Sequence, residues 1–382
     1  MAMTKKSQFI ASALVFQEPG LQIIRLAGSP TEMGLAHGRL LAGQLHCLRR
    51  EFLRYLGRLT LGLGAVPLYL LICCLAWRFR PYIPAALWEE LRAVAQGAGV
   101  HLSFILFINV MDDLLNNIPH CSTFAAPLRE SEAATFILGR TLDYPLFAQI
   151  LCRYNTVQLL FPRDGQPLAT VGWPGYCGVC AGMNRAGVAL GQLSASTSDV
   201  SMAGMPAAIR NRLALQHHQT VSDVAAAIVT RPGTLGANLI LASSREALLL
   251  EVSARHHQVR LPQAGILTAT NHYQSPQMQP WSGTAFRRPP LSPLEDYCFS
   301  LEYSQARDRR LQELLCNCSL NIARAQKILA DPHIVNPCDI TSVVFNPAAG
   351  ELYVAQGVEL PVSQRGRFRR LSALFGPDLQ VA

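Results

Sequence analysis

The first 120 residues carry apolar positions at helical spacing. Ser29-Pro30-Thr31-Glu32 has the composition of a helix start, because Ser29 can cap, Pro30 suits the first turn and Glu32 completes a capping box. The apolar residues that follow are Met33, Leu40, Leu41, Leu45, Leu48 and Phe52. Further helices are predicted from about Ala85 to the stop at Gly97-Ala98-Gly99, and from Phe104 to about Leu115 with Ser103 as cap. This portion is therefore predicted to be mostly helical.

From Cys121 onward the pattern changes to short β-rich runs separated by turn signals. Helical patterns lie between groups of these runs, at about Pro206–His217, Val221–Val229 and Ser304–Leu315. Grouped strands with helices between the groups predict an α+β layered fold. The predicted strands are Thr135–Arg140, Asn155–Phe161, Leu168–Trp173, Val188–Leu193, Asn238–Leu241, Leu248–Val252, Ile266–Thr270 and Thr341–Phe345.

The segment Leu59–Trp77 contains no charged residue and is about long enough to cross a bilayer. Pro67 and two glycines interrupt it, and arginines flank it on both sides, so the charge bias gives no orientation. Three interpretations stay open for this segment: a buried core helix, an interfacial helix and a membrane span.

Composition excludes several classes of protein. Half of the 382 residues are apolar and 15% are charged, which argues against disorder. The net charge is +8, but the arginines are scattered without interleaved aromatic residues, so no nucleic-acid partner is expected. The eleven cysteines have no framework spacing and predict free thiols in a reducing, cytoplasmic location. Peripheral membrane contact through Leu59–Trp77 stays open as one interpretation of that segment.

Candidate chemistry centres on Cys121, which is followed by Arg140-x-x-Asp143 on a strand pattern. An arginine near a thiol favours the nucleophilic thiolate, and a carboxylate can orient a basic amine. No histidine stands out as the base. The α-amino group of Cys121 itself, with a reference pKa of about 8, can serve if the chain is cut between His120 and Cys121. The alternatives are a small buried cysteine and a structural Arg140–Asp143 ion pair.

These motifs occur in an order that resembles the C45 peptidase and acyl-coenzyme A:6-aminopenicillanic acid acyltransferase family. That family is related to the choloylglycine hydrolases and the acid ceramidase-like amidases. The resemblance covers nearly the whole chain. Its pieces are Gly28–Gly34, His37-Gly38, Glu89–Leu91, Gly97–Gly99, Cys121, Gly139–Tyr144, Gly182–Asn184 with Gly187, Thr270–Tyr273, and Ser304 with Arg307 and Arg310.

The resemblance implies a four-layer αββα fold of N-terminal-nucleophile hydrolases with a helical N-terminal portion. It further implies self-cleavage into 1–120 and 121–382, which remain together as an α/β heterodimer. Cys121 would be the nucleophile with its own amine as base, Asp143 would hold that amine, and Arg140 would lower the thiol pKa. Asn271 would donate to the oxyanion, and Arg307 would support the site, with Arg310 as the competing candidate. Two positions depart from the family pattern, namely Thr141 in place of an Asn and Ser194 in place of an oxyanion Asn.

The expected reaction is attack of Cys121 on a non-peptide linear amide, with a thioester acyl-enzyme and no cofactor or metal. The substrate is expected to be a small-molecule or lipid-like N-acyl amide. Two alternatives stay open. The first is an acyltransferase that passes the acyl group to an amine. The second is a non-catalytic binding protein, or a thiol-metal protein using Cys177 and Cys180.

Overall fold

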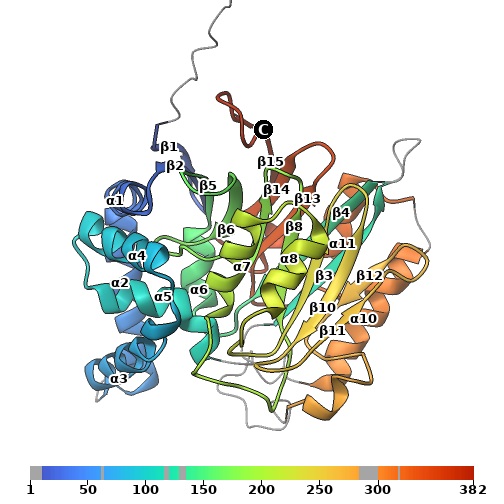
Figure 1. Cartoon of the computed structure of the whole chain (residues 1–382), viewed down its shortest axis with the longest axis horizontal. Helices are drawn as coiled ribbons and strands as arrows, with labels where there is room; N and C mark the ends of the chain where they lie inside the picture. Colours follow the sequence, from blue (N-terminus) through green and yellow to red (C-terminus); the bar gives the residue numbers. More distant parts are fainter. Residues whose placement is uncertain (1–10, 62–63, 116–119, 129–134, 284–299, 317–318) are drawn as a thin grey trace, which may run out of the picture.

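Two β-sheets lie face to face in the computed structural model of the chain, and helices cover both of their outer faces (Figure 1). The structure describes residues 11–61, 64–115, 120–128, 135–283, 300–316 and 319–382. The resulting order of layers is helix, sheet, sheet, helix. The predicted α+β, four-layer fold is therefore confirmed.

The larger sheet has nine strands in the order β1-β2-β5-β6-β7-β8-β9-β10-β11. Its pairings are antiparallel except for the parallel pair of β2 and β5. The strands are β1 Ala13–Glu18, β2 Leu21–Gly28, β5 Thr156–Pro162, β6 Leu168–Gly172, β7 Ala181–Asn184, β8 Ala189–Ser194, β9 Ala237–Ala242, β10 Ala247–Val252 and β11 His257–Arg260.

The smaller sheet has seven antiparallel strands in the order β12-β3-β4-β13-β14-β15-β16. It holds β3, which begins one residue before Cys121. The strands are β3 His120–Leu128, β4 Thr135–Asp143, β12 Leu267–Ala269, β13 Asp339–Asn346, β14 Glu351–Gln356, β15 Arg367–Ser372 and β16 Gln380–Val381.

Alternation along the strands explains why both faces of each sheet are buried. On β9, Leu239 and Leu241 pack toward helices α7 and α8, whereas Ile240 packs into the core cluster that the two sheets share. On β4, Leu138 faces the other sheet and Ile137 faces helices α10 and α11. Because successive side chains point to opposite faces, strands with apolar side chains at consecutive positions need a covering layer on each side.

Helices supply those covering layers. Helix α1 packs on β2, α7 on β7 and α8 on β9 and β10, while α10 covers β3 and β12 and α11 covers β4 and β13. Helices α1 to α5 gather beside the larger sheet at the left of Figure 1. The helices are α1 Pro30–Leu40, α2 Ala42–Leu59, α3 Ala65–Trp77, α4 Ala85–Ala98, α5 Leu102–Leu114, α6 Ala148–Leu151, α7 Ala207–His217, α8 Val221–Val229, α10 Leu301–Cys316, α11 Ile322–Leu329 and α12 Val362–Arg365.

The N-terminal helices begin and end close to the predicted signals. Ser29 and Glu32 form the capping box, and Gly99 adopts a left-handed conformation after α4, with φ of 65°. Two details differ. The first predicted helix is split at Leu41 into α1 and α2, and α5 is capped by the His101 ring rather than by Ser103. Strands β1 and β2 precede these helices and were not indicated by the sequence.

The apolar segment Leu59–Trp77 is not one continuous helix. Helix α2 ends at Leu59, and α3 contributes only the 13 residues Ala65–Trp77. Among the described residues, no helix combines the length and the apolarity that crossing a membrane requires. Cys73 and Ala76 are buried, whereas Val66 is 61% exposed, so the segment is not a fully buried core helix either.

Candidate active site

Cys121 and Arg140 lie on the same face of the smaller sheet, between the two sheets. The register of β3 and β4 pairs Cys121 with Leu142 and Thr123 with Arg140, so Arg140 is the diagonal neighbour of Cys121. The Nη2 atom of Arg140 lies 3.7 Å from the Cys121 Sγ, and its Nε donates to the Gln192 carbonyl at 2.7 Å. The guanidinium is therefore fixed by the neighbouring strand β8 while it faces the thiol.

Asp143 lies on the other face of the same strand. Residues three apart on a strand point in opposite directions, so Arg140 faces β8 while Asp143 faces helix α10. There Asp143 lies 4.0 Å from Nη1 of Arg307, and both side chains are fully buried. Asp143 thus contacts Arg307, on the face of β4 opposite to the one from which Arg140 projects.

Asn271, two residues beyond β12, holds the backbone nitrogen of Cys121. Its Oδ1 accepts from Cys121 N at 3.2 Å and from Arg307 Nη2 at 2.7 Å. Its Nδ2 donates to the carbonyl of Ser194 at 2.8 Å. A side-chain amide has two N–H bonds, so one donor is engaged with Ser194 and a second is left for an oxyanion.

Arg307 rather than Arg310 lies in this cluster. The Nη1 of Arg307 donates to the Cys121 carbonyl at 2.7 Å and to Ser122 Oγ at 2.9 Å. Arg310 points away and forms an ion pair with Asp331 at 2.8 Å. Of the two arginines that the sequence left open, Arg307 is the one that the contact of α10 with β3 brings into this cluster.

Ser304, which stands at the start of the predicted helix Ser304–Leu315, belongs to the same network. It lies inside α10, and its Oγ accepts from the Asn271 backbone N–H at 2.9 Å. It also meets Thr270 Oγ1 at 3.0 Å and His272 Nδ1 at 2.9 Å. The available signal was its spacing of three residues from Arg307, which places both on one helix face.

Thr141, the departure from the family pattern, supports the nucleophile strand. Its Oγ1 accepts from the backbone N–H of Ser122 at 3.0 Å. Ser122, which the sequence did not single out, also accepts from Arg307. A hydroxyl at position 141 is therefore sufficient to fix the residue that follows the nucleophile.

Burial dominates the electrostatics of the thiol. It raises the pKa of Cys121 to about 12, because no water reaches the sulfur; Arg140 lowers this pKa and the Asp143 carboxylate raises it. The expectation that Arg140 favours the thiolate holds in direction. In the uncut chain, however, desolvation is the larger effect and the thiol remains protonated at neutral pH.

The predicted cut lies where β3 begins. His120 and Cys121 are both in the strand, and His120 is paired with Asp143. Cys121 is 1% exposed. For the alternative of a thiol-metal module, the described part of the chain contains no group of three or more His, Cys, Asp or Glu side chains placed to hold a metal ion.

The structure thus brings together a cysteine at the start of a strand, two buried arginines and an aspartate, in a two-sheet sandwich covered by helices. The family model of acyl-coenzyme A:6-aminopenicillanic acid acyl-transferase matches residues 128–343, more than half of the chain. The chain therefore belongs to this family. The matched segment starts after Cys121, so the match does not include the proposed nucleophile or the cut before it.

Two curated relatives match this chain at low sequence identity. An uncharacterized protein of Archaeoglobus fulgidus is 26% identical over 232 residues, covering 53% of this chain and 38% of its own. Protein dcd1A of Dictyostelium discoideum is 22% identical over 268 residues, covering 63% and 60%. This chain thus spans less than two thirds of the length of either relative.

Three solved structures are similar at low identity. They are a Caenorhabditis elegans ortholog of N-acylethanolamine-hydrolyzing acid amidase (TM-score 0.43, 15% identity, 59% of this chain and 93% of that one), a mutant of the conjugated bile acid hydrolase of Clostridium perfringens (0.43, 12%, 68% and 96%) and penicillin V acylase of Agrobacterium tumefaciens (0.38, 12%, 66% and 91%).

Proposed function

We propose that the chain is a self-processing cysteine amide hydrolase that cuts itself before Cys121 and then forms a thioester acyl-enzyme. The observation that carries this proposal is the environment of Cys121. Its sulfur faces Arg140 at 3.7 Å, while its backbone nitrogen and carbonyl are held by Asn271 and Arg307. The backbone groups of any buried residue need partners, but a cysteine that only filled space would not need a guanidinium facing its sulfur.

Self-cleavage is proposed as an N-to-S acyl shift. The Cys121 Sγ attacks the carbonyl carbon of His120, the peptide C–N bond breaks, and the thiol proton passes to the departing nitrogen. Water then hydrolyses the thioester, which leaves a carboxylate on His120 and a free thiol and amine on Cys121. Asn271 supports this step because it orients the nitrogen that becomes the amine.

In the mature enzyme the new amine is the general base. It takes the thiol proton as sulfur attacks the substrate carbonyl, then gives it to the leaving amine as the acyl-enzyme forms. Asp143 is proposed to hold the ammonium form, Arg140 to stabilise the thiolate, and the second N–H of Asn271 to donate to the oxyanion. Arg307 fixes Asn271 and the Cys121 carbonyl.

The proposed substrate is an N-acyl amide with an apolar acyl chain. Support comes from the exposed apolar face of α3, which is suited to a bilayer surface where such amides partition. The second candidate is acyl transfer to an amine, which the name of the family favours. Both reactions share the acyl-enzyme, and they differ in whether water or an amine accepts the acyl group.

Intact-mass measurement of the purified protein tests the self-cleavage. We expect two species, one ending at His120 and one beginning at Cys121. They should copurify, because β2 of the first fragment pairs with β5 of the second along seven residue pairs. Cys121→Ala should remain a single chain, because the attacking sulfur is absent.

A matched control is Cys180→Ala, which removes another buried thiol near Arg140 but not the nucleophile. This variant should be cut like the native chain. An active enzyme that remains one uncut chain would contradict the proposal. An uncut chain with no turnover of any N-acyl amide would favour a non-catalytic binding protein.

A further inference from the structure

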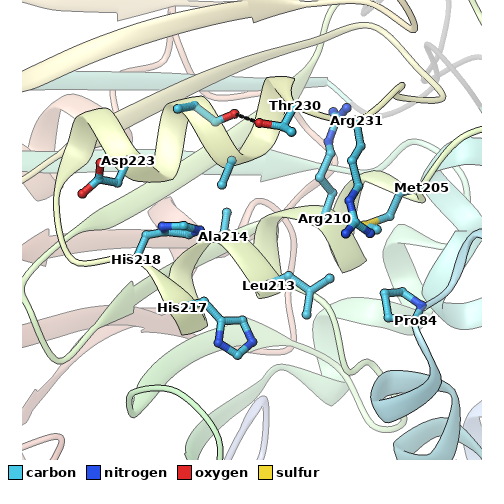
Figure 2. A pocket seen from close by; sticks show the side chains of 12 residues that line it. Pro84, Met205, Arg210, Leu213, Ala214, His217, His218, Asp223, Thr230 and Arg231 are labelled. Atoms are coloured by element: carbon cyan, nitrogen blue, oxygen red, sulfur yellow. Dashed lines mark hydrogen bonds between the residues drawn. The ribbon is translucent and has the colours of Figure 1, made fainter.

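A cavity of about 580 Å³ lies between α7 and α8, away from the Cys121 cluster (Figure 2). This volume is in the range of pockets that take small molecules. Its apolar wall includes Met205, Leu213 and Ala214. Its polar part includes Arg210 and Arg231, and both arginines also line an adjoining cavity of about 250 Å³.

Arg210 is the unusual member of this wall. Its side chain projects from α7 and is only 4% exposed. Among the described residues, its Nε and Nη2 have no hydrogen-bond partner, and no carboxylate lies within ion-pair distance of the guanidinium. Leaving donors of a buried cation unpaired costs free energy that a bound anion can offset.

Burial lowers the pKa of Arg210 to about 10, and the nearby Asp113 opposes that decrease. The side chain therefore remains charged at neutral pH. Among the described residues, Asp113 forms no ion pair with it: its Oδ1 accepts from the Ala207 N–H at 3.0 Å and from the Thr234 hydroxyl, and its buried Oδ2 has no hydrogen-bond partner. Burial also raises the pKa of Asp113 to about 7, so part of its population is uncharged at that pH.

The guanidinium is held in place by its surroundings. A Cβ added to Gly233 would lie 2.4 Å from Nη1 of Arg210, so the backbone at this glycine packs against the cation. Arg231 adds a second positive charge where α8 has ended, and His217 and His218 lie at the end of α7 (Figure 2). The acidic side chain in this wall, Asp223, is engaged with Thr220 through the Thr220 hydroxyl at 2.7 Å.

We propose that this cavity binds an oxyanion with an apolar tail, either a carboxylate or a phosphate ester. Arg210 supplies two N–H donors in a fixed plane, a geometry that matches two oxygens of such a head group. Met205, Leu213 and Ala214 offer contact surface to the tail. The inference does not depend on the proposed reaction at Cys121.

Calorimetric titration with matched eight-carbon probes tests the proposal. Octanoate and octyl phosphate should bind the native protein, and the tighter of the two identifies the head group. Octanol and octylammonium should bind at least about tenfold more weakly, because neither offers an oxyanion to the guanidinium. Inorganic phosphate without the tail should bind more weakly than octyl phosphate, since it leaves the apolar wall unfilled.

Arg210→Met should lose about tenfold or more in affinity for both anionic probes. Arg231→Gln, which keeps Arg210, should lose less. The control is Arg245→Gln, at an exposed arginine in the turn between β9 and β10. This variant should bind like the native protein.

Because Arg210→Met removes a buried charge, thermal unfolding should confirm that this variant folds. Unchanged affinity of folded Arg210→Met, or equal binding of octanol, would overturn the proposal. In Cys121→Ala binding should persist, which separates this site from the proposed catalysis.

Discussion

At the scale of single residues, the alternation of side chains along β4 places two residues of the candidate site on opposite faces of the strand. Arg140 and Asp143 belong to one short motif, yet they act on opposite sides of β4. Arg140 meets the sulfur of Cys121, and Asp143 meets Arg307 on the side of α10. In the proposed reaction, Arg140 stabilises the sulfur from one face of β4 and Asp143 holds the amine from the other.

Removing the Arg140 charge should slow alkylation of the thiol. Arg140 lowers the Cys121 pKa against the larger effect of burial, so Arg140→Leu should raise it further. Because only the thiolate reacts, we expect alkylation of Cys121 at pH 7 to slow at least about tenfold. Iodoacetamide labelling followed by peptide mass measurement reports the rate at this cysteine alone.

The same argument predicts that the labelling rate of Cys121 increases with pH. In chain that is still uncut, where the pKa of Cys121 is about 12, the thiolate fraction rises about tenfold per pH unit between pH 7 and 10. The labelling rate of the peptide that spans His120 and Cys121, which comes only from uncut chain, should follow it. Arg310→Leu is the control, because this arginine pairs with Asp331 outside the site. Equal labelling rates in Arg140→Leu and native protein would mean that Arg140 is only structural.

The sequence predicted the site residues that have reactive or charged side chains in a motif. It did not predict the roles of residues that depend on contacts between distant segments. A thiol, an Arg-x-x-Asp motif and an Asn after a strand are recognisable in the sequence. Ser122 was missed, because a serine on a strand has a simpler local interpretation. Ser304 was marked by the resemblance, but its contacts were not predicted, because a serine near a helix start has a simpler local interpretation too. Their roles come from the contact of α10 with β3, which joins segments far apart in the chain.

At the scale of elements, apolar runs predicted the strands of the sheet interiors. Strands such as β4, β9 and β13 are buried on both faces, so each contains an apolar run, as in Phe136–Leu138, Leu239–Ala242 and Val343–Phe345. Strands β1, β11 and β15 lie at or near sheet edges and are largely exposed. They are held by backbone pairing to a neighbour, and pairing leaves no hydrophobic pattern in the sequence.

Glycines allow helices α1 and α4 to approach each other closely. Adding a single methyl group at this contact should therefore destabilise the fold. A Cβ added at Gly38 would lie 2.3 Å from the Val94 carbonyl oxygen, and one at Gly34 would lie 2.4 Å from that of Glu90. We expect Gly38→Ala to destabilise the fold by about 1–3 kcal/mol, because the helices must move apart. That cost exceeds the gain of about 1 kcal/mol in helix propensity.

The measurement is the midpoint of chemical or thermal unfolding. Gly43→Ala is the matched control, because the new Cβ in α2 would meet no atom within 4 Å. This variant should be neutral or slightly more stable, as helix propensity alone then changes. Equal stability of Gly38→Ala and Gly43→Ala would show that the two helices have room to adjust.

At the scale of the whole molecule, the predicted portions 1–120 and 121–382 share a sheet and are not separate layers. Strand β2 precedes the N-terminal helices and pairs in parallel with β5. Helix α5, which ends shortly before the proposed cut, packs against α7. The composition change at Cys121 therefore marks a change of secondary structure within one fold. A local pattern could not show that the chain returns to the same sheet.

The surface of α3 supports a last prediction about where the molecule meets its substrate. Val66, Leu70 and Leu71 are each more than half exposed, and the helix itself carries no charge. The exposed arginines Arg54 and Arg58 precede it in the chain, and Arg78 follows it directly. An apolar face with nearby cations favours an anionic bilayer surface, since each such arginine adds about 1 kcal/mol of attraction.

We therefore predict that the protein floats with vesicles that contain phosphatidylserine and binds vesicles of phosphatidylcholine alone more weakly. Leu70→Glu combined with Leu71→Glu should reduce flotation at least about tenfold, because it places charges on the face that enters the lipid. The control is Leu261→Glu, the same change at a leucine that is 70% exposed outside α3. It should leave flotation unchanged.

If binding concentrates long-chain amides at the enzyme, the double variant should also lose turnover of long acyl chains while it keeps turnover of short ones. Failure of the native protein to float, or equal loss in the Leu261 control, would show that the exposed face of α3 has no part in membrane contact.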